Sequence, residues 1–307
     1  MSNAPVALFV YRRPEHTRAT VEALLRNPEA AQTDLHVFSD AARATGDEDA
    51  VKQVRRYVRE ITGMRSTTMI ERSRNHGLAN SVIDGVSRLC ESHERTIVME
   101  DDLVVAPSFL SYMNAALNRY RDDDSAMQIS GYMFPANMGA STDSFFLPFT
   151  TSWGWATWAR AWREFDPSMR GLEALAGDRR LRDAFNLYGA YDYYGMLLRQ
   201  KRGEVDSWAI RWYLSVFMRN GLTLYPAKTL VQNTGFDGSG THCGTGNFGQ
   251  ATGLPDVRVT SFPERVALYP EWRRVLAGFP KRSNNLRELA GTLLRRVNRA
   301  IGIRNGN

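Results

Sequence analysis

Cysteine is scarce in this sequence: only Cys90 and Cys243 occur among its 307 residues. Two cysteines form neither a disulfide framework nor a zinc site. Long apolar runs are also missing, and none approaches the ~18 residues that a membrane span requires. The start, "MSNAPVALFVYRRPEH", has no basic segment before its apolar stretch and predicts a first strand, not a signal peptide. We therefore expect a cytoplasmic protein with two structural thiols.

Excess positive charge is missing from most of the chain. The net charge is +6, and residues 281–307 hold seven basic residues against one acid, so the remainder is nearly neutral. This distribution argues against nucleic acid as a partner of the main body. The tail places five apolar residues near one helical stripe, namely Leu286, Leu289, Leu293, Val297 and Ile301. Two interpretations stand: a helix that docks on the domain, or an amphipathic peripheral contact with anionic lipid at the inner membrane face.

Short apolar runs alternate with helical patterns in the first two-fifths of the chain. The runs are "PVALFVY", "DLHVFSD", "TTMIERS" and "TIVMEDD", and amphipathic segments separate them, including "NHGLANSVIDGVSRLCE". Strands that alternate with helices predict βαβ units. The fold class is therefore α/β, with a mostly parallel sheet flanked by helices on both faces.

The pattern changes at about residue 126. "MQISGYM" and "SFFLPFTTS" are typical of strands without intervening helices, and an aromatic segment and a glycine-rich loop follow. We predict a first half over residues 1–125, a second, α+β half over 126–250, and a C-terminal extension over 251–307. The two halves can share one continuous sheet.

Three carboxylates, Glu100, Asp101 and Asp102, directly follow an apolar run. Proline favours the first helical position, so Pro107 predicts a helix with Ala106 as its N-cap, and the acids lie too far upstream to cap it. On an extended backbone Glu100 and Asp102 point to one side and Asp101 to the other. A solvated acidic loop is one interpretation. The other is a site for Mg²⁺ or Mn²⁺, because such ions take one or two carboxylates and complete their shell with phosphates and water. Magnesium phosphatases and nucleotidyltransferases use similar clusters.

This region resembles a known family. "VMEDDLVVAPSFLSYMNAAL" is similar to the DXD region of GT-A-fold nucleotide-sugar glycosyltransferases, and most of all to the N-acetylglucosaminyltransferases that initiate complex N-glycans. "RNHGLANSVIDGV", "SWGWATWARAWREFDP", "VDSWAIRW" and "VQNTGFDGSGTH" match further family segments in the same order, over about residues 5–245. The resemblance implies a GT-A fold and a soluble, bacterial-type relative.

The resemblance assigns the donor side of the site. It makes Asp102 the metal ligand, Asp101 a ribose or sugar contact, and Glu100 a supporting residue. Asp40 matches the base-recognising aspartate, and Arg13 a donor-contacting arginine, although the "YRRP" spacing leaves Arg12 open.

Further donor residues fall in loops. Asn75 and Gly77 belong to the Asn-x-Gly segment common in the inverting GT-A family, and His242 lies in the loop expected over the donor. That loop differs from the family's sequence, so the identities of the donor sugar and the acceptor cannot be inferred from the family.

The acceptor side centres on Asp206, which matches the catalytic base; an in-line base inverts the anomeric configuration. Neighbouring aromatic residues predict partial desolvation and greater basicity of this carboxylate. The alternative is an N-cap for the helix "SWAIRWYLSVFMRN".

Tryptophans form the rest of the predicted acceptor side. Trp153, Gly154 and Trp155 offer a flat platform for a sugar face. The spacing of Trp155, Trp158 and Trp162 fits one helical face, and we assign Trp158 and Trp162 to the core.

The expected function is inverting, metal-dependent transfer of a hexosyl or N-acetylhexosaminyl group, as in polysaccharide biosynthesis. The donor is a nucleotide sugar, with UDP favoured, and the acceptor a saccharide or lipid-linked saccharide. One alternative, a sugar nucleotidyltransferase, needs a glycine-rich phosphate loop after the first strand, where this chain has "YRRPEHTR". The other is a non-enzymatic basic protein that binds membrane or nucleic acid, with its charge confined to the tail.

Overall fold

The computed structural model describes residues 2–136, 142–238, 254 and 257–278. His242, Cys243 and the tail over 281–307 lie outside the described residues, so the predictions on them stay predictions. Within the described residues, no helix combines the length and the apolar character needed to cross a membrane.

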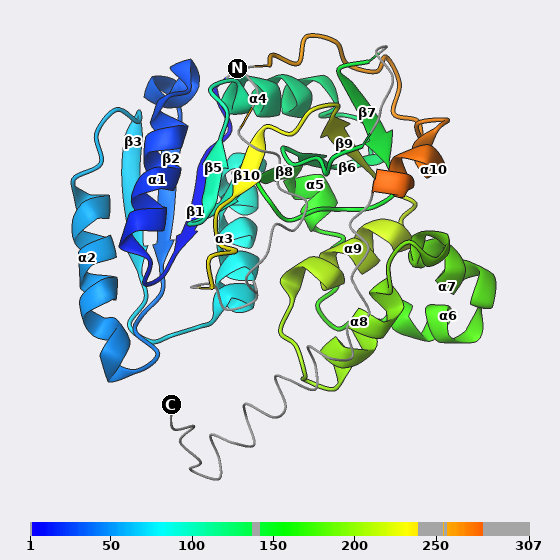
Figure 1. Cartoon of the computed structure of the whole chain (residues 1–307), viewed down its shortest axis with the longest axis horizontal. Coiled ribbons are helices and arrows are strands. Elements are labelled where there is room, and N and C mark those ends of the chain that lie inside the picture. The colour runs from blue at the N-terminus through cyan, green and yellow to red at the C-terminus, as the bar shows by residue number, and fades with distance from the viewer. Residues whose placement is uncertain (1, 137–141, 239–253, 255–256, 279–307) are drawn as a thin grey trace, which may run out of the picture.

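The first half is a parallel four-stranded unit with the order β3-β2-β1-β4 (Figure 1). Its elements are, in chain order, β1 (Val6–Val10), α1 (Pro14–Leu25), η1 (Pro28–Gln32), β2 (Asp34–Ser39), η2 (Thr45–Asp47), α2 (Glu48–Arg59), β3 (Ser66–Glu71), α3 (Leu78–His93) and β4 (Arg95–Glu100). The chain builds outward from β1 to β3 and then returns to the other side of β1. Because parallel crossovers are right-handed, this return places α3 on the opposite face from α1 and α2.

The second half extends the same sheet. It contributes β6 (Ala126–Ser130), β7 (Ser144–Leu147), β8 (Trp155–Trp158) and β9 (Leu222–Pro226), giving the order β3-β2-β1-β4-β8-β6-β9-β7. Four of the seven pairings are parallel and three are antiparallel. The predicted α/β class with a mostly parallel, helix-flanked sheet is confirmed. The division near residue 125 falls inside one continuous sheet.

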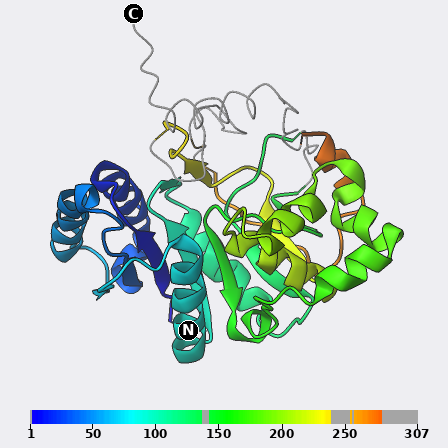
Figure 2. The same ribbon diagram turned by 90° about the horizontal axis from the view of Figure 1, so that it is seen from below.

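The remaining elements surround this sheet. They are α4 (Phe109–Arg119), α5 (Ala159–Trp162), α6 (Gly171–Gly177), α7 (Arg179–Phe185), η3 (Leu187–Gly189), α8 (Tyr193–Lys201), α9 (Trp208–Met218), α10 (Trp272–Val275) and η4 (Leu276–Gly278). A two-stranded antiparallel ribbon joins β5 (Leu103–Val105) to β10 (Val231–Asn233). Figures 1 and 2 both show α6, α7 and α8 on the side of the molecule away from α1 and α2.

Burial explains why the central strands form. All five residues of β1 are buried, as are Ile97, Val98 and Met99 of β4, which is typical of a strand covered on both faces. Helix α3 approaches this sheet closely at Gly85, where an added Cβ would lie 2.7 Å from the ring of Phe9. A glycine is therefore required at that contact.

Two local predictions are wrong. Helix α4 begins at Phe109, two residues after Pro107, which lies in the preceding turn, so Ala106 is not its N-cap. Trp155 and Trp158 lie in strand β8 and not on a helix, because β8 pairs with both β4 and β6. The sheet pairing overrides the helical spacing of the tryptophans.

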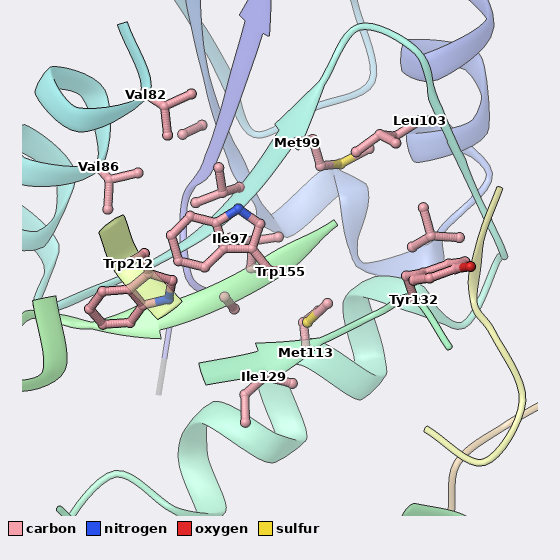
Figure 3. Close-up of a cluster of buried hydrophobic side chains, with 14 of the residues drawn as sticks. Val82, Val86, Ile97, Met99, Leu103, Met113, Ile129, Tyr132, Trp155 and Trp212 are labelled. Atoms are coloured by element: carbon pink, nitrogen blue, oxygen red, sulfur yellow. The ribbon is translucent and has the colours of Figure 1, made fainter. Parts of the chain in front are cut away.

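An aromatic cluster fills the space between the sheet and α9. Trp155 stacks on Trp208 at a centroid distance of 5.0 Å, and Trp162 contacts Trp212 at 5.1 Å. Figure 3 shows Trp155 and Trp212 among aliphatic side chains such as Ile97. Trp158 and Trp162 are 2% and 6% exposed, as predicted for core residues.

Gly154 tests how closely this part of the core is packed. Its φ is +60°, and an added Cβ would lie 2.8 Å from Cγ2 of Val231. We expect Gly154→Ala to lower the free energy of unfolding by about 2 kcal/mol, measured by urea denaturation, because it combines left-handed strain with overpacking. Gly177→Ala is the matched control, since nothing lies within 4 Å of the added methyl group. Equal effects of the two substitutions would contradict this view of the packing.

Candidate functional site

The candidate site lies at the carboxyl ends of β1, β2 and β4. Arg13 follows β1, Asp40 follows β2, and Asp101 and Asp102 follow β4. The strand order reverses at β1, and in open α/β sheets ligands bind beyond the carboxyl ends of the strands at such a reversal.

Arg13 holds the two aspartates together. Its Nη2 donates to Oδ1 of Asp101 and, at 2.9 Å, to Oδ2 of Asp102. The Arg13 side chain is only 17% exposed, whereas Arg12 is 47% exposed and pairs with Asp47 at 2.5 Å. Of the two arginines left open by the sequence, Arg13 is therefore the one in the carboxylate cluster.

The expectation that Asp101 and Asp102 point to opposite sides is wrong. Glu100 is the last residue of β4, and Asp101 and Asp102 form a turn before β5. The turn replaces the extended alternation and aims both carboxylates at Arg13. Thr20 fixes this turn because its hydroxyl donates to the backbone carbonyl of Asp101 at 2.8 Å.

Burial makes the cluster electrostatically unusual. Burial, and then the neighbouring Asp102 and Asp101 carboxylates, raise the pKa of Glu100 to about 8. Burial also raises the pKa of Asp101, although Arg13 opposes this shift. Burial works against the charge on Arg13, but the two aspartates outweigh it and raise the pKa of the guanidinium. Burial is thus the main cause of the raised pKa of both carboxyl groups, and the charges of the neighbouring carboxylates add to it.

The cluster contains buried polar atoms that still lack partners among the described residues. They are Oδ2 of Asp101, Oδ1 of Asp102 and Nη1 of Arg13. Such atoms are costly to leave unpaired and point to a bound partner. The two oxygens suit a hard divalent cation, and the guanidinium nitrogen suits an anion.

The described residues can hold a divalent cation only with few protein ligands. Within the described parts of the chain, no group of three or more His, Cys, Asp or Glu side chains is placed to hold a metal. The described residues thus supply one or two carboxylates, and water or a substrate phosphate can complete the shell. This is the arrangement that Mg²⁺ adopts with nucleotide substrates.

The segment after β10 covers the cluster. The amide of Thr234 donates to the Asp102 carbonyl at 2.8 Å, and His16 Nε2 lies 3.2 Å from Oδ2 of Asp237. An added Cβ at Gly235 would lie 2.2 Å from Oδ2 of Asp102. His16, on the first turn of α1, thus contacts the segment that covers the cluster, and sequence reasoning missed this contact.

Gly235 gives a direct test of this close approach. We expect Gly235→Ala to displace the Asp102 carboxylate and to weaken Mn²⁺ binding about 10-fold, measured by titration calorimetry. The reason is steric, since a Cβ contact of 2.2 Å is far inside van der Waals contact. Gly177→Ala, whose methyl group meets nothing within 4 Å, should bind Mn²⁺ as the unmodified protein does. Unchanged binding by the Gly235 variant would contradict the arrangement.

Asp40, Asn75 and Gly77 lie together at the end of β2 and the start of α3. The Asp40 carboxylate accepts from the amides of His76 and Gly77, each at 2.9 Å, and the Asn75 side chain donates to the Ala41 carbonyl at 2.7 Å. These bonds position the loop at the N-terminus of α3. A direct donor contact by these residues stays a prediction.

Arg55 supports the same edge and was missed by sequence reasoning. Its Nη2 donates to the backbone carbonyls of Ser39, Asp40 and Arg72, and its Nη1 lies 3.1 Å from Glu71. It joins the ends of β2 and β3. A basic residue in a charged amphipathic helix gives no sequence signal for such a role.

Asp206 lies at the start of α9 but does not cap it. The cap is Ser207, whose hydroxyl accepts from the Ile210 amide, so the capping alternative is wrong. The Asp206 side chain is 59% exposed and pairs with Arg211 at 3.1 Å, so the expected desolvation is wrong as well. Its carboxylate is therefore accessible and is oriented by Arg211.

A cavity of about 250 Å³ lies beside Asp206. One wall is the first turn of α9, with Trp208, Ala209 and Ile210, and another is Trp153. Trp153 also contacts Phe236 at a centroid distance of 5.6 Å. Because Phe236 directly follows Gly235, Trp153 links the cavity to the carboxylate cluster.

The predicted tryptophan platform is only half present. Trp153 is half-buried and lines the cavity. Trp155 is fully buried against Trp208, so it packs the core and presents no face to solvent, contrary to the expectation. Gly154 has a structural role, because its backbone carbonyl accepts a hydrogen bond from the Gly131 amide at 2.7 Å.

Comparison with known proteins gives similarity of fold alone. No family model and no curated protein matches the chain. Among solved structures, the chain is similar to GalNAc-T7 with UDP, GalNAc and Mn²⁺, at a TM-score of 0.46 and 10% identity over 73% of this chain and 41% of that one. It is also similar to TarS from S. aureus, at a TM-score of 0.40 and 10% identity over 75% of this chain and 36% of that one. The chain thus spans about two-fifths of each of these proteins, and its function has to be argued from its own site.

Proposed function

We propose that this chain is an inverting glycosyltransferase of the GT-A type that uses a nucleotide-sugar donor. The observation that supports it best is the buried Arg13–Asp101–Asp102 cluster at the strand reversal, with unpaired oxygens and an unpaired guanidinium nitrogen. A diphosphate with a divalent cation satisfies both kinds of atom at once. The donor is a UDP-sugar in this proposal, with Mn²⁺ or Mg²⁺.

The donor side follows from the charges of the cluster. Asp102, assisted by Asp101, would hold the cation, which when bound neutralises charge on the departing diphosphate. Arg13 Nη1 donates to a phosphate oxygen, a charge-assisted bond in a site with little water. Glu100 and the loop positioned by Asp40 orient the sugar and nucleoside. His242 belongs to the same proposal as a donor contact.

The acceptor side follows from Asp206. Its exposed carboxylate takes the proton of the acceptor hydroxyl, whose oxygen forms a new bond to the anomeric carbon as the bond to the diphosphate breaks. Arg211 orients the carboxylate through the contact at 3.1 Å. Attack from the face opposite the leaving group inverts the anomeric configuration.

The acceptor in this proposal is a saccharide or a lipid-linked saccharide. The transferred group is a hexosyl or N-acetylhexosaminyl group, and the setting is cytoplasmic. A peripheral membrane contact through residues 281–307 is part of the same proposal. The neutral main body gives no support to a nucleic-acid partner.

A donor-hydrolysis screen tests the proposed function. The full chain is incubated with common UDP-, GDP- and CMP-sugars with Mn²⁺, and nucleotide release is followed over hours. We expect slow release from one nucleotide class, abolished by EDTA. No release from any donor, with or without added saccharide acceptors, would overturn the proposal.

A further inference from the structure

The cavity beside Asp206 has a composition that the donor chemistry does not explain. Eight of its fourteen lining residues are aromatic, and among these described residues none carries a charge or a carboxamide. A phosphate or a carboxylate buried there would have no counter-charge in the lining. The cavity is therefore unsuited to the nucleotide or to any anionic group.

Three polar side chains of the lining are engaged with residues outside it. Trp212 donates its ring N–H to Gln128 at 2.6 Å, and the Tyr213 hydroxyl donates to the Phe185 carbonyl at 2.9 Å. The Thr151 hydroxyl bonds with that of Ser130 at 2.6 Å. These three groups cannot bond the hydroxyl groups of a sugar ring, and each hydroxyl group buried without a partner costs about 1–3 kcal/mol.

The size of the cavity matches one compact group. An engineered apolar cavity of about 150 Å³ takes up benzene, so 250 Å³ holds a single ring with a short substituent but not a disaccharide. Trp153, Met196 and Ala209 are half-buried, so the lining remains in contact with solvent.

The position of the cavity connects it to the acceptor. Asp206 lies two residues before the turn of α9 that forms one wall, and Trp153, in another part of the lining, contacts the segment that covers Asp102. A group held in the cavity therefore belongs to the molecule whose hydroxyl reaches Asp206, not to the donor.

We infer that this cavity binds an uncharged apolar ring carried by the acceptor, so that the substrate is an apolar aglycone bearing a hydroxyl or a sugar attached to such an aglycone. The inference rests on the proposed function for the meaning of "acceptor". The binding itself needs neither donor nor cation.

Calorimetry with three probes tests the inference on the full chain without donor. Phenyl β-D-glucopyranoside and benzyl alcohol carry an apolar ring, and methyl β-D-glucopyranoside is the matched probe without it. We expect the phenyl glucoside to bind at least about 10-fold more tightly than the methyl glucoside, from the apolar area buried. Equal affinities, or no binding of either ring-bearing probe, would overturn the inference.

Variants of the lining residues test whether the phenyl glucoside binds in the cavity. Ala209→Phe fills the cavity and should weaken phenyl glucoside binding at least 10-fold, whereas Ala174→Phe, at an exposed position of α6, should leave it unchanged. Met196→Gln keeps the side-chain size but adds a polar group to the lining. It is the second cavity variant, and it replaces Ala209→Phe if that protein does not fold. Unchanged affinity in the folded cavity variants would place the probe elsewhere and overturn the inference. A failed donor screen with successful ring binding would reject the glycosyltransferase proposal alone.

Discussion

The Asp102→Asn protein is expected to bind UDP no more tightly with Mn²⁺ than without it. The substitution keeps the shape of the side chain but removes the charge that a hard cation requires from this buried oxygen. We expect Mn²⁺ to raise UDP affinity at least about 10-fold in the unmodified protein and to have no effect in the variant. Titration calorimetry with UDP, with and without Mn²⁺, measures this difference.

The same substitution should leave the free energy of unfolding unchanged or raise it. Burial is the largest cause of the raised pKa of Glu100, and the Asp102 and Asp101 carboxylates add to it, so removing the Asp102 charge relieves a repulsion that offsets the lost pairing with Arg13. Stability and binding are thus expected to move in opposite directions, as at many functional sites. A merely structural Asp102 would instead lose stability, measured by urea denaturation, and keep its response to Mn²⁺.

Asp34→Asn is the matched control for Asp102→Asn. Asp34 also pairs with an arginine, Arg65, with Nε and Oδ1 separated by 2.8 Å, but it lies at the opposite end of β2 from the site. We expect its response to UDP and Mn²⁺ to equal that of the unmodified protein. Loss of the response in both variants would mean that the effect is not specific to the carboxylate cluster.

Asp206→Asn is expected to lower the turnover number for glycosyl transfer by about 100-fold or more. An amide of the same shape cannot accept the proton of the acceptor hydroxyl, and a positioned general base typically contributes a factor of about 10²–10⁴. UDP binding should be unchanged, since Asp206 lies on the acceptor side. Initial rates with the donor found in the hydrolysis screen, together with calorimetry, separate the two effects.

Asp183→Asn controls for loss of an exposed ion pair. Asp183 is 53% exposed and lies 3.7 Å from Arg179, comparable with the 59% exposure and 3.1 Å of the Asp206–Arg211 pair. We expect full turnover from Asp183→Asn. A turnover number that falls less than about 3-fold in Asp206→Asn would remove this residue from the base role.

The edge of the sheet that carries the site was predictable from the sequence. Strands β2, β3 and β4 end in the polar residues Ser39, Glu71 and Glu100, and the carboxyl ends of parallel strands share one edge. The assignment of Arg13, Asp40 and Asp102 to one donor site came from the family resemblance and not from this pattern. Local periodicity is sufficient for β1 and for the apolar part of β4, because these residues are buried and form apolar runs.

The orientation of side chains at that edge was not predictable. The turn at Asp101 and Asp102 depends on β5 pairing with β10, a contact between segments more than 120 residues apart. Trp155 enters a strand for the same reason, since β8 is inserted between β4 and β6. The N-cap of α9 could not be predicted either. Asp206 and Ser207 are both favourable N-cap residues, and only the structure shows that Ser207 is the cap.

The central claim is that the Arg13–Asp101–Asp102 cluster binds a nucleotide diphosphate together with a divalent cation. Thermal unfolding of the full chain with UDP, GDP or CMP, each with and without Mn²⁺, tests it most directly, because tight binding to the folded state raises Tm. We predict a rise in Tm with one nucleotide, UDP first, that requires Mn²⁺ and is lost in Asp102→Asn. An unchanged Tm with every nucleotide in the presence of Mn²⁺ would contradict the claim.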